Sequence, residues 1–260
     1  MFLAQFKKYN SQYELGIKTI SFRSSYPKIL KEPIDLKLEK SFDNYDLFFN
    51  SKGLLLHSIH TEKRNNFKVI YGYNRKGSLI SIMKLISEIN ELDSLSEFEY
   101  DNKGRIETER VRSFYNTGWN DTTEYIHTYT DNTEEIFITC DNEEEEDGTF
   151  YYTYDNKKRI IEEKAIRGEN EFIYWNKNEY DEDDNLIREF SLDENGEPAG
   201  VYEFLPVKNG LISGYNYKSK DGSYRRDYLF TLNEKGHWTN QVMLTDGEPR
   251  YFYDRTIEYY

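Results

Sequence analysis

One short stretch returns along most of the chain and limits the architectures that this chain can adopt. The clearest copy is Tyr100–Ile106, with the sequence YDNKGRI. Phe98 and Tyr100 alternate with acidic residues, which is the period of a strand with one buried face. The next four residues supply turn chemistry, because Asp and Asn bond their own backbone and Gly takes positive φ without a Cβ clash. The stretch predicts a β-hairpin whose tip is residues 101–104.

Seven further copies, several of them degraded, lie on either side of this one. The position that corresponds to Gly104 falls at residues 53, 77, 134, 158, 184, 210 and 236. Consecutive copies are 24 to 30 residues apart, and a recurrence in this range is typical of a repeat architecture. Because sheets much beyond about ten strands curl or split, we predict an all-β, elongated and coiled antiparallel β-meander of about eight ~26-residue hairpin repeats. It would form an open spiral or a partly closed sheet.

The repeated motif, Tyr-Asp-x-x-Gly-Arg-Ile/Leu with an aromatic residue two positions upstream, resembles the YD repeat of Rhs-type proteins. The best matches are Phe98–Ile106, Thr153–Ile160 and Glu179–Leu186, and the resemblance covers about residues 45–240. It implies a sheet of β-hairpin repeats, which in large family members winds into a shell around a toxin domain. This chain is far shorter than a shell-forming chain and shows no shell-plugging or self-cleavage segment, so only the local β architecture carries over.

The sequence divides into two parts by the regularity of the repeats. Residues 1–44 predict an irregular N-terminal β cap, because terminal units of repeat arrays depart from the consensus. Residues 45–260 predict a single YD-like β-hairpin repeat domain. Residues 79–92 also satisfy helical spacing, although the repeat register favours a strand to about Ser87. The last strand, Tyr251–Tyr260, would lie at an edge of the sheet.

Charge and hydropathy limit the partners and the compartment. The formal net charge is −14 over 260 residues, whereas a nucleic-acid-binding protein needs a basic footprint. We therefore expect no nucleic-acid partner. The sequence has no apolar run of spanning length and no signal peptide, and its single cysteine suits a reducing compartment. These features predict a cytoplasmic protein with no membrane span if Met1 is the native start, and an exported one if a signal has been trimmed.

The motifs that carry chemistry are missing from the sequence. It contains no nucleophile elbow, phosphate-binding loop or zinc-protease motif, and Cys140 reads as a small apolar filler. His57 and His60 are three residues apart, so a strand places them on opposite faces. Asp181–Asn185 has the alternating oxygens of a calcium loop, but Leu186 stands where that loop needs Gly. We predict no enzyme, no cofactor and no metal site, and leave weak calcium binding by acidic loops open.

Aromatic and acidic loop residues are the candidates for contact with a partner. Trp119 lies with Tyr115 in the longest connection, and exposed aromatic residues on loops suit protein interfaces or sugar stacking. Packing of loop against sheet, or a solvated acidic loop, would explain the same residues. The predicted partner-binding residues are Tyr115, Trp119, Trp175, Glu143, Glu144, Glu145 and Glu146.

Together these features predict a non-enzymatic protein-binding scaffold, since repeat arrays use broad surfaces for recognition. The resemblance to YD repeats and the acidic charge point to a bacterial toxin–antitoxin setting. There the protein would be an immunity protein that binds and neutralises a cognate toxin, which could be basic. The alternative is a carbohydrate-binding or cell-surface repeat module that uses the Tyr and Trp residues.

Overall fold

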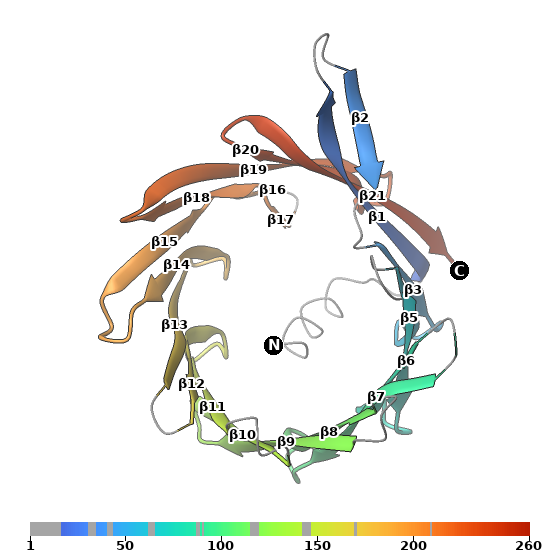
Figure 1. Ribbon diagram of the computed structural model, residues 1–260, viewed down its shortest axis with the longest axis vertical. Helices are drawn as coiled ribbons and strands as arrows, with labels where there is room; N and C mark the ends of the chain where they lie inside the picture. Colours follow the sequence, from blue (N-terminus) through green and yellow to red (C-terminus); the bar gives the residue numbers. More distant parts are fainter. Residues whose placement is uncertain are drawn as a thin grey trace. The chain divides into compact units, whose positions relative to one another are not determined.

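The computed structural model describes residues 17–30, 35–40, 44–61, 66–86, 89, 91–114, 120–141, 147–168, 171–208 and 210–260. Every regular element among these residues is a β-strand, and the strands follow one another in chain order (Figure 1). Nineteen strands belong to one sheet, and a separate two-stranded hairpin is formed by β16 (Val207–Lys208) and β17 (Leu211–Ile212). The prediction of an all-β, repeat-like fold is confirmed.

The chain divides into two compact units. Unit 1 contains the described residues up to Ser96 together with Phe230–Met243 and Pro249–Tyr260. Its strands are β1 (Ile17–Leu30), β2 (Asp35–Lys40), β3 (Asn44–Phe49), β4 (Leu55–Thr61), β5 (Asn66–Tyr73), β6 (Leu79–Ile86), most of β20 (Trp238–Thr245) and most of β21 (Glu248–Tyr259). The predicted strand at the start of residues 79–92 is confirmed by β6.

Unit 1 holds most of the buried apolar side chains of the described residues. The buried ones include Ile17, Ile20, Phe49, Leu55, Val69, Tyr71, Leu79 and Met243. A ladder of rings also crosses its strands: Phe22 stacks on Tyr45 at 4.6 Å between centroids, and His60 stacks on Phe67 at 4.6 Å. Such cross-strand pairs fix the register of neighbouring strands.

Unit 2 is a meander that spans Glu97–Leu229 and includes Leu244–Glu248. Each of its strands is antiparallel to the next. In order they are β8 (Ile106–Phe114), β9 (Asn120–Tyr129), β10 (Thr133–Cys140), β11 (Gly148–Tyr154), β12 (Ile160–Arg167), β13 (Glu171–Tyr180), β14 (Leu186–Leu192), β15 (Pro198–Phe204), β18 (Gly214–Ser219) and β19 (Gly222–Leu232). Strand β7 (Glu91–Tyr100) straddles the boundary between the units.

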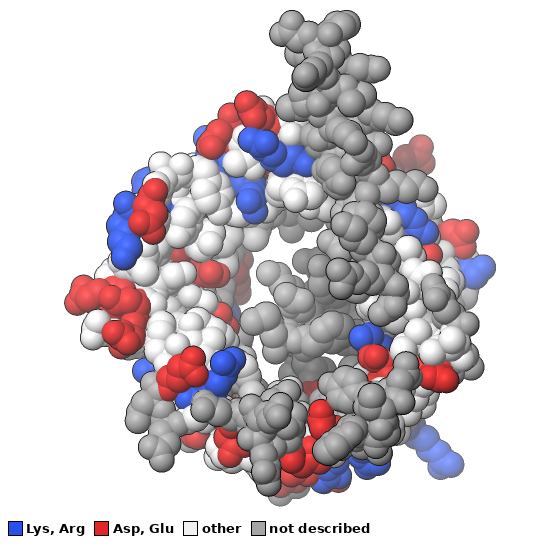
Figure 2. Space-filling model, viewed as in Figure 1, with Lys and Arg blue, Asp and Glu red and all other residues white. Residues whose placement is uncertain are grey.

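The two faces of unit 2 carry different side chains. On one face, Glu134 lies opposite Tyr152, which lies opposite Glu163, which lies opposite Asn176. We call this the tyrosine face; its tyrosines include Tyr125, Tyr129, Tyr152, Tyr154, Tyr174, Tyr180, Tyr202, Tyr215, Tyr217, Tyr224 and Tyr228. The opposite, charged face carries ion-paired side chains. In the view of Figure 2, acidic and basic side chains lie interleaved around the rim.

The prediction of an open spiral or a partly closed sheet is wrong. Strand β21 is not an edge, because residues from Ile17 to Ser25 of β1 pair with residues from Tyr259 back to Phe252. The same strand β1 pairs through Thr19–Phe22 with Phe48–Tyr45 of β3. The first and last strands of the sheet are therefore hydrogen-bonded, and the antiparallel sheet closes on itself through β1.

This closure also overturns the predictions about membrane and compartment. They rested on the absence of a long apolar run, which is the mark of a spanning helix. A closed antiparallel sheet satisfies its backbone groups internally and is the other structure that can cross a bilayer, and its strands carry no such run. The predictions of no membrane span and of a cytoplasmic protein are wrong on this ground.

Candidate functional site

The repeated turn has one hydrogen-bond pattern at six of its tips, and Asp155 shows it best. Its Oδ1 accepts hydrogen bonds from the backbone N–H groups of Lys157 and Arg159, both at 2.9 Å. The N–H of Lys158 donates to the Asp155 carbonyl at 2.9 Å, and Lys158 itself has a φ of 64°. Because its carboxylate accepts these bonds, above all from the Arg159 backbone, the pKa of Asp155 lies below its usual range. The other five repeat tips of this kind begin at Asn50, Asn74, Asp101, Asp181 and Asn233. The hairpin turn that begins at Asp193, between two repeat tips, has the same pattern.

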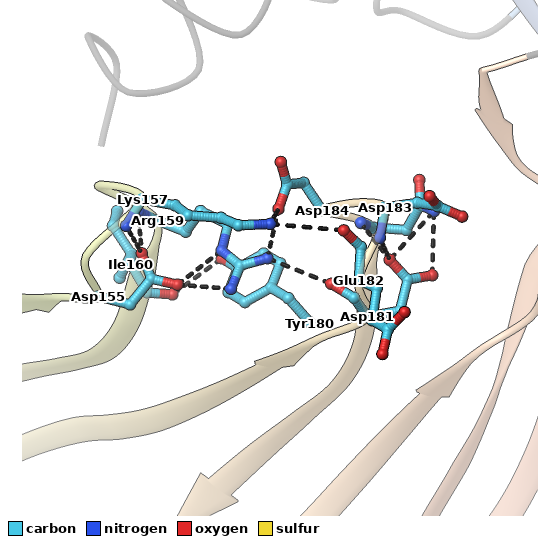
Figure 3. A network of polar contacts seen from close by, with 10 residues as sticks. Asp155, Lys157, Arg159, Ile160, Tyr180, Asp181, Glu182, Asp183 and Asp184 are labelled. Atoms are coloured by element: carbon cyan, nitrogen blue, oxygen red, sulfur yellow. Dashed lines mark hydrogen bonds and ion pairs between the residues drawn. The ribbon is translucent and has the colours of Figure 1, made fainter.

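Neighbouring tips are joined to one another, which explains the Tyr and Arg positions of the repeat. The Tyr180 hydroxyl donates to the Ile160 carbonyl at 2.8 Å, and the Arg159 guanidinium stacks on the Tyr180 ring at 4.6 Å. Both Arg159 and Lys157 bind Asp184, at 2.7 and 2.6 Å (Figure 3). The same link joins Tyr129 to the Ile106 carbonyl at 2.8 Å. The motif therefore holds adjacent hairpins in register.

Asp181–Asn185, the calcium-like sequence, forms one of these tips. Asp181 Oδ1 accepts from the N–H groups of Asp183 and Asn185 at 3.0 and 2.8 Å, and Asn185 Nδ2 donates to Oδ2 at 3.0 Å. These bonds, led by those from Asn185, lower the pKa of Asp181. Within the part of the chain that the structure describes, no group of three His, Cys, Asp or Glu side chains is arranged to hold a metal ion.

A half-buried carboxylate, Glu134, is the centre of the polar contacts on the tyrosine face. His127 Nδ1 lies 2.9 Å from its Oε1, and the Tyr154 hydroxyl donates to its Oε2 at 2.5 Å. Burial opposes ionisation of Glu134, but the bonds from His127 and Tyr154 outweigh it and hold its pKa below the usual value. Burial and this carboxylate together raise the pKa of Tyr154. The cluster fixes three side chains from β9, β10 and β11.

Glu134 was predicted to be a turn residue, and the structure places it inside a strand. Strand β10 begins at Thr133, and the tight turn before it is closed by the Thr130 N–H donating to the Thr133 carbonyl at 3.0 Å. The sequence does hold a signal for its role. Glu134 is in phase with Ile136 and Ile138, so an alternating strand carries a carboxylate on its apolar side.

A second cluster of rings lies on the same face, across β15, β18 and β19. Tyr202 lies opposite Tyr217, which lies opposite Tyr224, with ring centroids 4.6 and 5.1 Å apart. One step along the strands, Tyr215 lies opposite Arg226. The Arg226 guanidinium is 5.4 Å from the ring of Tyr215 and 5.3 Å from that of Tyr224. A row of rings on three adjacent strands offers a stacking surface.

The charged face holds Trp175, the predicted partner-binding residue that the structure describes. Its indole N–H donates to Glu162 at 2.6 Å, and Lys164 and Lys177 lie 4.6 and 5.2 Å from its ring. A Cβ built on Gly196 would lie 3.0 Å from the same ring. Trp175 is thus held by neighbours on three sides. The other predicted partner-binding residues, Tyr115, Trp119, Glu143, Glu144, Glu145 and Glu146, lie outside the described residues.

The structure also shows the surroundings of Cys140, His57 and His60. Cys140 ends β10 with its Sγ 3.6 Å from the Thr123 hydroxyl. His57 stacks on Phe48 at 4.3 Å, whereas His60 stacks on Phe67 and bonds Ser58. Burial lowers the pKa of both histidines. The described residues include no helix long and apolar enough to span a membrane.

Comparisons with known proteins give structural likeness without sequence likeness. No protein-family model and no curated protein matches the chain. A porin-like protein from Bacteroides uniformis is 10% identical, with a TM-score of 0.35, over 93% of this chain and 96% of that one. The TcdB2-TccC3-Cdc42 and TcdB2-TccC3 structures are 10% and 11% identical, with TM-scores of 0.36 and 0.35. They match 86% and 87% of this chain, which spans only 14% and 15% of their chains. Scores this low carry no argument about function.

Proposed function

We propose that the protein is a non-enzymatic scaffold that binds a partner protein on its tyrosine face. The observation that carries the proposal is the composition and order of that face. The tyrosines of this face and Arg226 lie side by side on neighbouring strands, and Tyr and Arg are enriched at the energetically important positions of protein interfaces. Tyrosine supplies a large amphipathic contact with only two side-chain torsions to order.

The tyrosines are already held in place, which supports the proposal energetically. Tyr129, Tyr154 and Tyr180 each donate a hydrogen bond to a fixed acceptor on another strand. Burial raises the pKa of Tyr152 and Tyr174. A surface ordered before binding loses less side-chain entropy when the partner arrives, so more of the contact energy appears as affinity.

The chemistry of the described residues supports a role without catalysis. The His127 ring is tied to Glu134, and Cys140 lies beside a threonine rather than a base. Nucleophilic catalysis needs a nucleophile within hydrogen-bond reach of a base. Ser58 lies 2.8 Å from His60 Nε2, but the Ser58 side chain is fully buried and so out of reach of a substrate. We extend the proposal, through the resemblance of the turns to YD repeats, to a bacterial immunity protein that neutralises a toxin.

Capture of the partner from the native organism tests the proposal. The protein is used as bait, the beads are washed at moderate salt, and retained proteins are identified by mass spectrometry. We expect one protein to remain in stoichiometric amount and to form a complex when both purified proteins are mixed. A toxin encoded beside this chain would establish the immunity role, and the absence of any retained protein would contradict the scaffold.

The row formed by Tyr202, Tyr217 and Tyr224 favours carbohydrate binding as a second function. Rings spaced 4.6 and 5.1 Å apart across three strands could stack successive sugars. A glycan array separates the two functions: binding to a sugar that the Tyr217→Ala variant loses would establish the carbohydrate module. A blank array with a retained protein partner would reject it.

A further inference from the structure

Arg226 differs from the other arginines on the sheet of unit 2 in what surrounds it. Arg110 binds Glu124 at 2.5 Å, and Arg112 binds Glu97 at 2.7 Å. Arg225, the chain neighbour of Arg226, lies on the charged face and binds Asp227 at 2.8 Å. Among the described residues, Arg226 has no carboxylate partner, and its buried Nε has no hydrogen-bond acceptor.

The immediate neighbours of Arg226 are aromatic rings rather than anions. The guanidinium stacks on Tyr215 and Tyr224, whose ring centroids are 6.1 Å apart. Tyr228 is 6.3 Å from Tyr215 between ring centroids. Rings that exclude water raise the strength of any charge-assisted hydrogen bond made beside them. A guanidinium that stacks on rings keeps its terminal N–H groups for a further acceptor.

We propose that Arg226 and the tyrosines around it form a binding site for an organic carboxylate. A carboxylate matches the fork of the guanidinium in shape and in charge. A single guanidinium neutralises one negative charge, and Glu189 lies on the same face opposite Tyr202. A doubly charged phosphate would be repelled there without a second cation. An apolar or aromatic body on the ligand would stack on Tyr224 or Tyr217.

This carboxylate site is independent of the proposed scaffold function, because a small free carboxylate can bind there whether or not a partner protein exists. The probes are benzoate, which joins one carboxylate to one ring, and inorganic phosphate as the dianion. The signal to follow is the Arg226 Nε–H cross-peak of the 15N-labelled full chain. Its assignment comes from its disappearance in Arg226→Gln.

We expect benzoate to shift this cross-peak saturably, and phosphate to bind roughly tenfold more weakly or not at all. By calorimetry, Arg226→Gln should lose benzoate binding and Arg226→Lys should weaken it, because the ammonium lacks the planar fork. Arg225→Gln is the matched control and should bind as the wild type does. If Arg226→Gln fails to fold, the wild-type titration and Arg226→Lys still decide.

Three results would overturn the assignment. The cross-peak could fail to saturate with benzoate, or Arg226→Gln could bind benzoate as tightly as the wild type. Equal affinity for phosphate and benzoate would show that the site does not prefer a singly charged carboxylate over a doubly charged anion. Failure of partner capture would leave the site standing, so the two proposals fail separately.

Discussion

At the scale of single residues, the position of Glu134 in the repeat predicts a turn residue, although Glu134 is the centre of a hydrogen-bonded cluster inside a strand. The spacing of the repeats aligns residue 134 with turn glycines, whereas the alternation of β10 places it beside His127 and Tyr154. Two signals disagreed in the sequence, and tertiary contacts decided between them. Strand alternation also predicts the surroundings of Arg226. Arg226 is in phase with Tyr224 and Tyr228 and so shares their face, whereas Arg225 is in phase with Asp227.

Replacement of Glu134 by Gln removes the charged acceptor from two hydrogen bonds. Its side chain is 16% exposed, so we expect the free energy of unfolding to fall by about 1–3 kcal/mol. Urea titration followed by circular dichroism measures this. Glu135→Gln, one residue away on the exposed side of the same strand, is the control and should change little. Equal effects in the two variants would contradict the role of Glu134.

The contribution of Glu134 should depend on pH with a defined sign. Its pKa in the folded protein lies below the ordinary value of 4.5. A carboxyl with a lowered folded pKa stabilises the protein above its unfolded pKa, and that stability is lost as pH falls through the folded pKa. The difference in unfolding free energy between wild type and Glu134→Gln should therefore be full at neutral pH and shrink below about pH 4.5. A difference that grows in acid would contradict this.

At the scale of elements, the hairpin tips were the most predictable part of the fold. Asp or Asn followed three residues later by Gly encodes the turn locally, and Gly53, Gly77, Gly104 and Gly236 all adopt the expected positive φ. The hydrogen bonds between neighbouring tips could not be predicted from the sequence. The bond from Tyr180 to Ile160, for example, joins residues that are close only because of the register of their strands. Turn chemistry is local, whereas register is not.

Gly104→Ala tests the turn conformation. A Cβ at this residue meets no atom within 4 Å, so any cost comes from its φ of +78°. A left-handed conformation costs a residue with a Cβ about 1–2 kcal/mol, and we expect that loss in thermal or urea unfolding. Lys158→Ala is the comparison, because Lys158 already carries a Cβ at a φ of 64°. An equal loss at both positions would contradict the argument from φ.

At the scale of the whole molecule, the sequence indicated strands and repeats but not how the sheet ends. Closure depends on β1 meeting β21, and these strands come from opposite ends of the chain. No local pattern encodes a contact of such separation, and the charges on β21 read equally well as edge protection. The same limit explains why the membrane and compartment predictions failed.

A disulfide across β1 and β21 tests closure. Ser21 lies opposite Thr256, and facing residues of antiparallel strands have Cα atoms about 4.5–5.5 Å apart, within disulfide range. Ser21→Cys with Thr256→Cys, in a Cys140→Ser background, should form an intramolecular bond on mild oxidation, seen as faster migration on a non-reducing gel. The Ser21→Cys single variant is the control. Thiols that stay free in the double variant would show that the ends do not meet.

The most direct test of the account is the affinity of the captured partner for two matched tyrosine variants. Tyr217 is in the centre of the ring row on the tyrosine face, whereas Tyr151 is 38% exposed on the charged face. By calorimetry, Tyr217→Ala should weaken binding by at least 2 kcal/mol, about the threshold of an interface hot spot, and Tyr151→Ala should leave it unchanged. Binding that survives Tyr217→Ala and is lost with Tyr151→Ala would place recognition on the charged face and contradict the account.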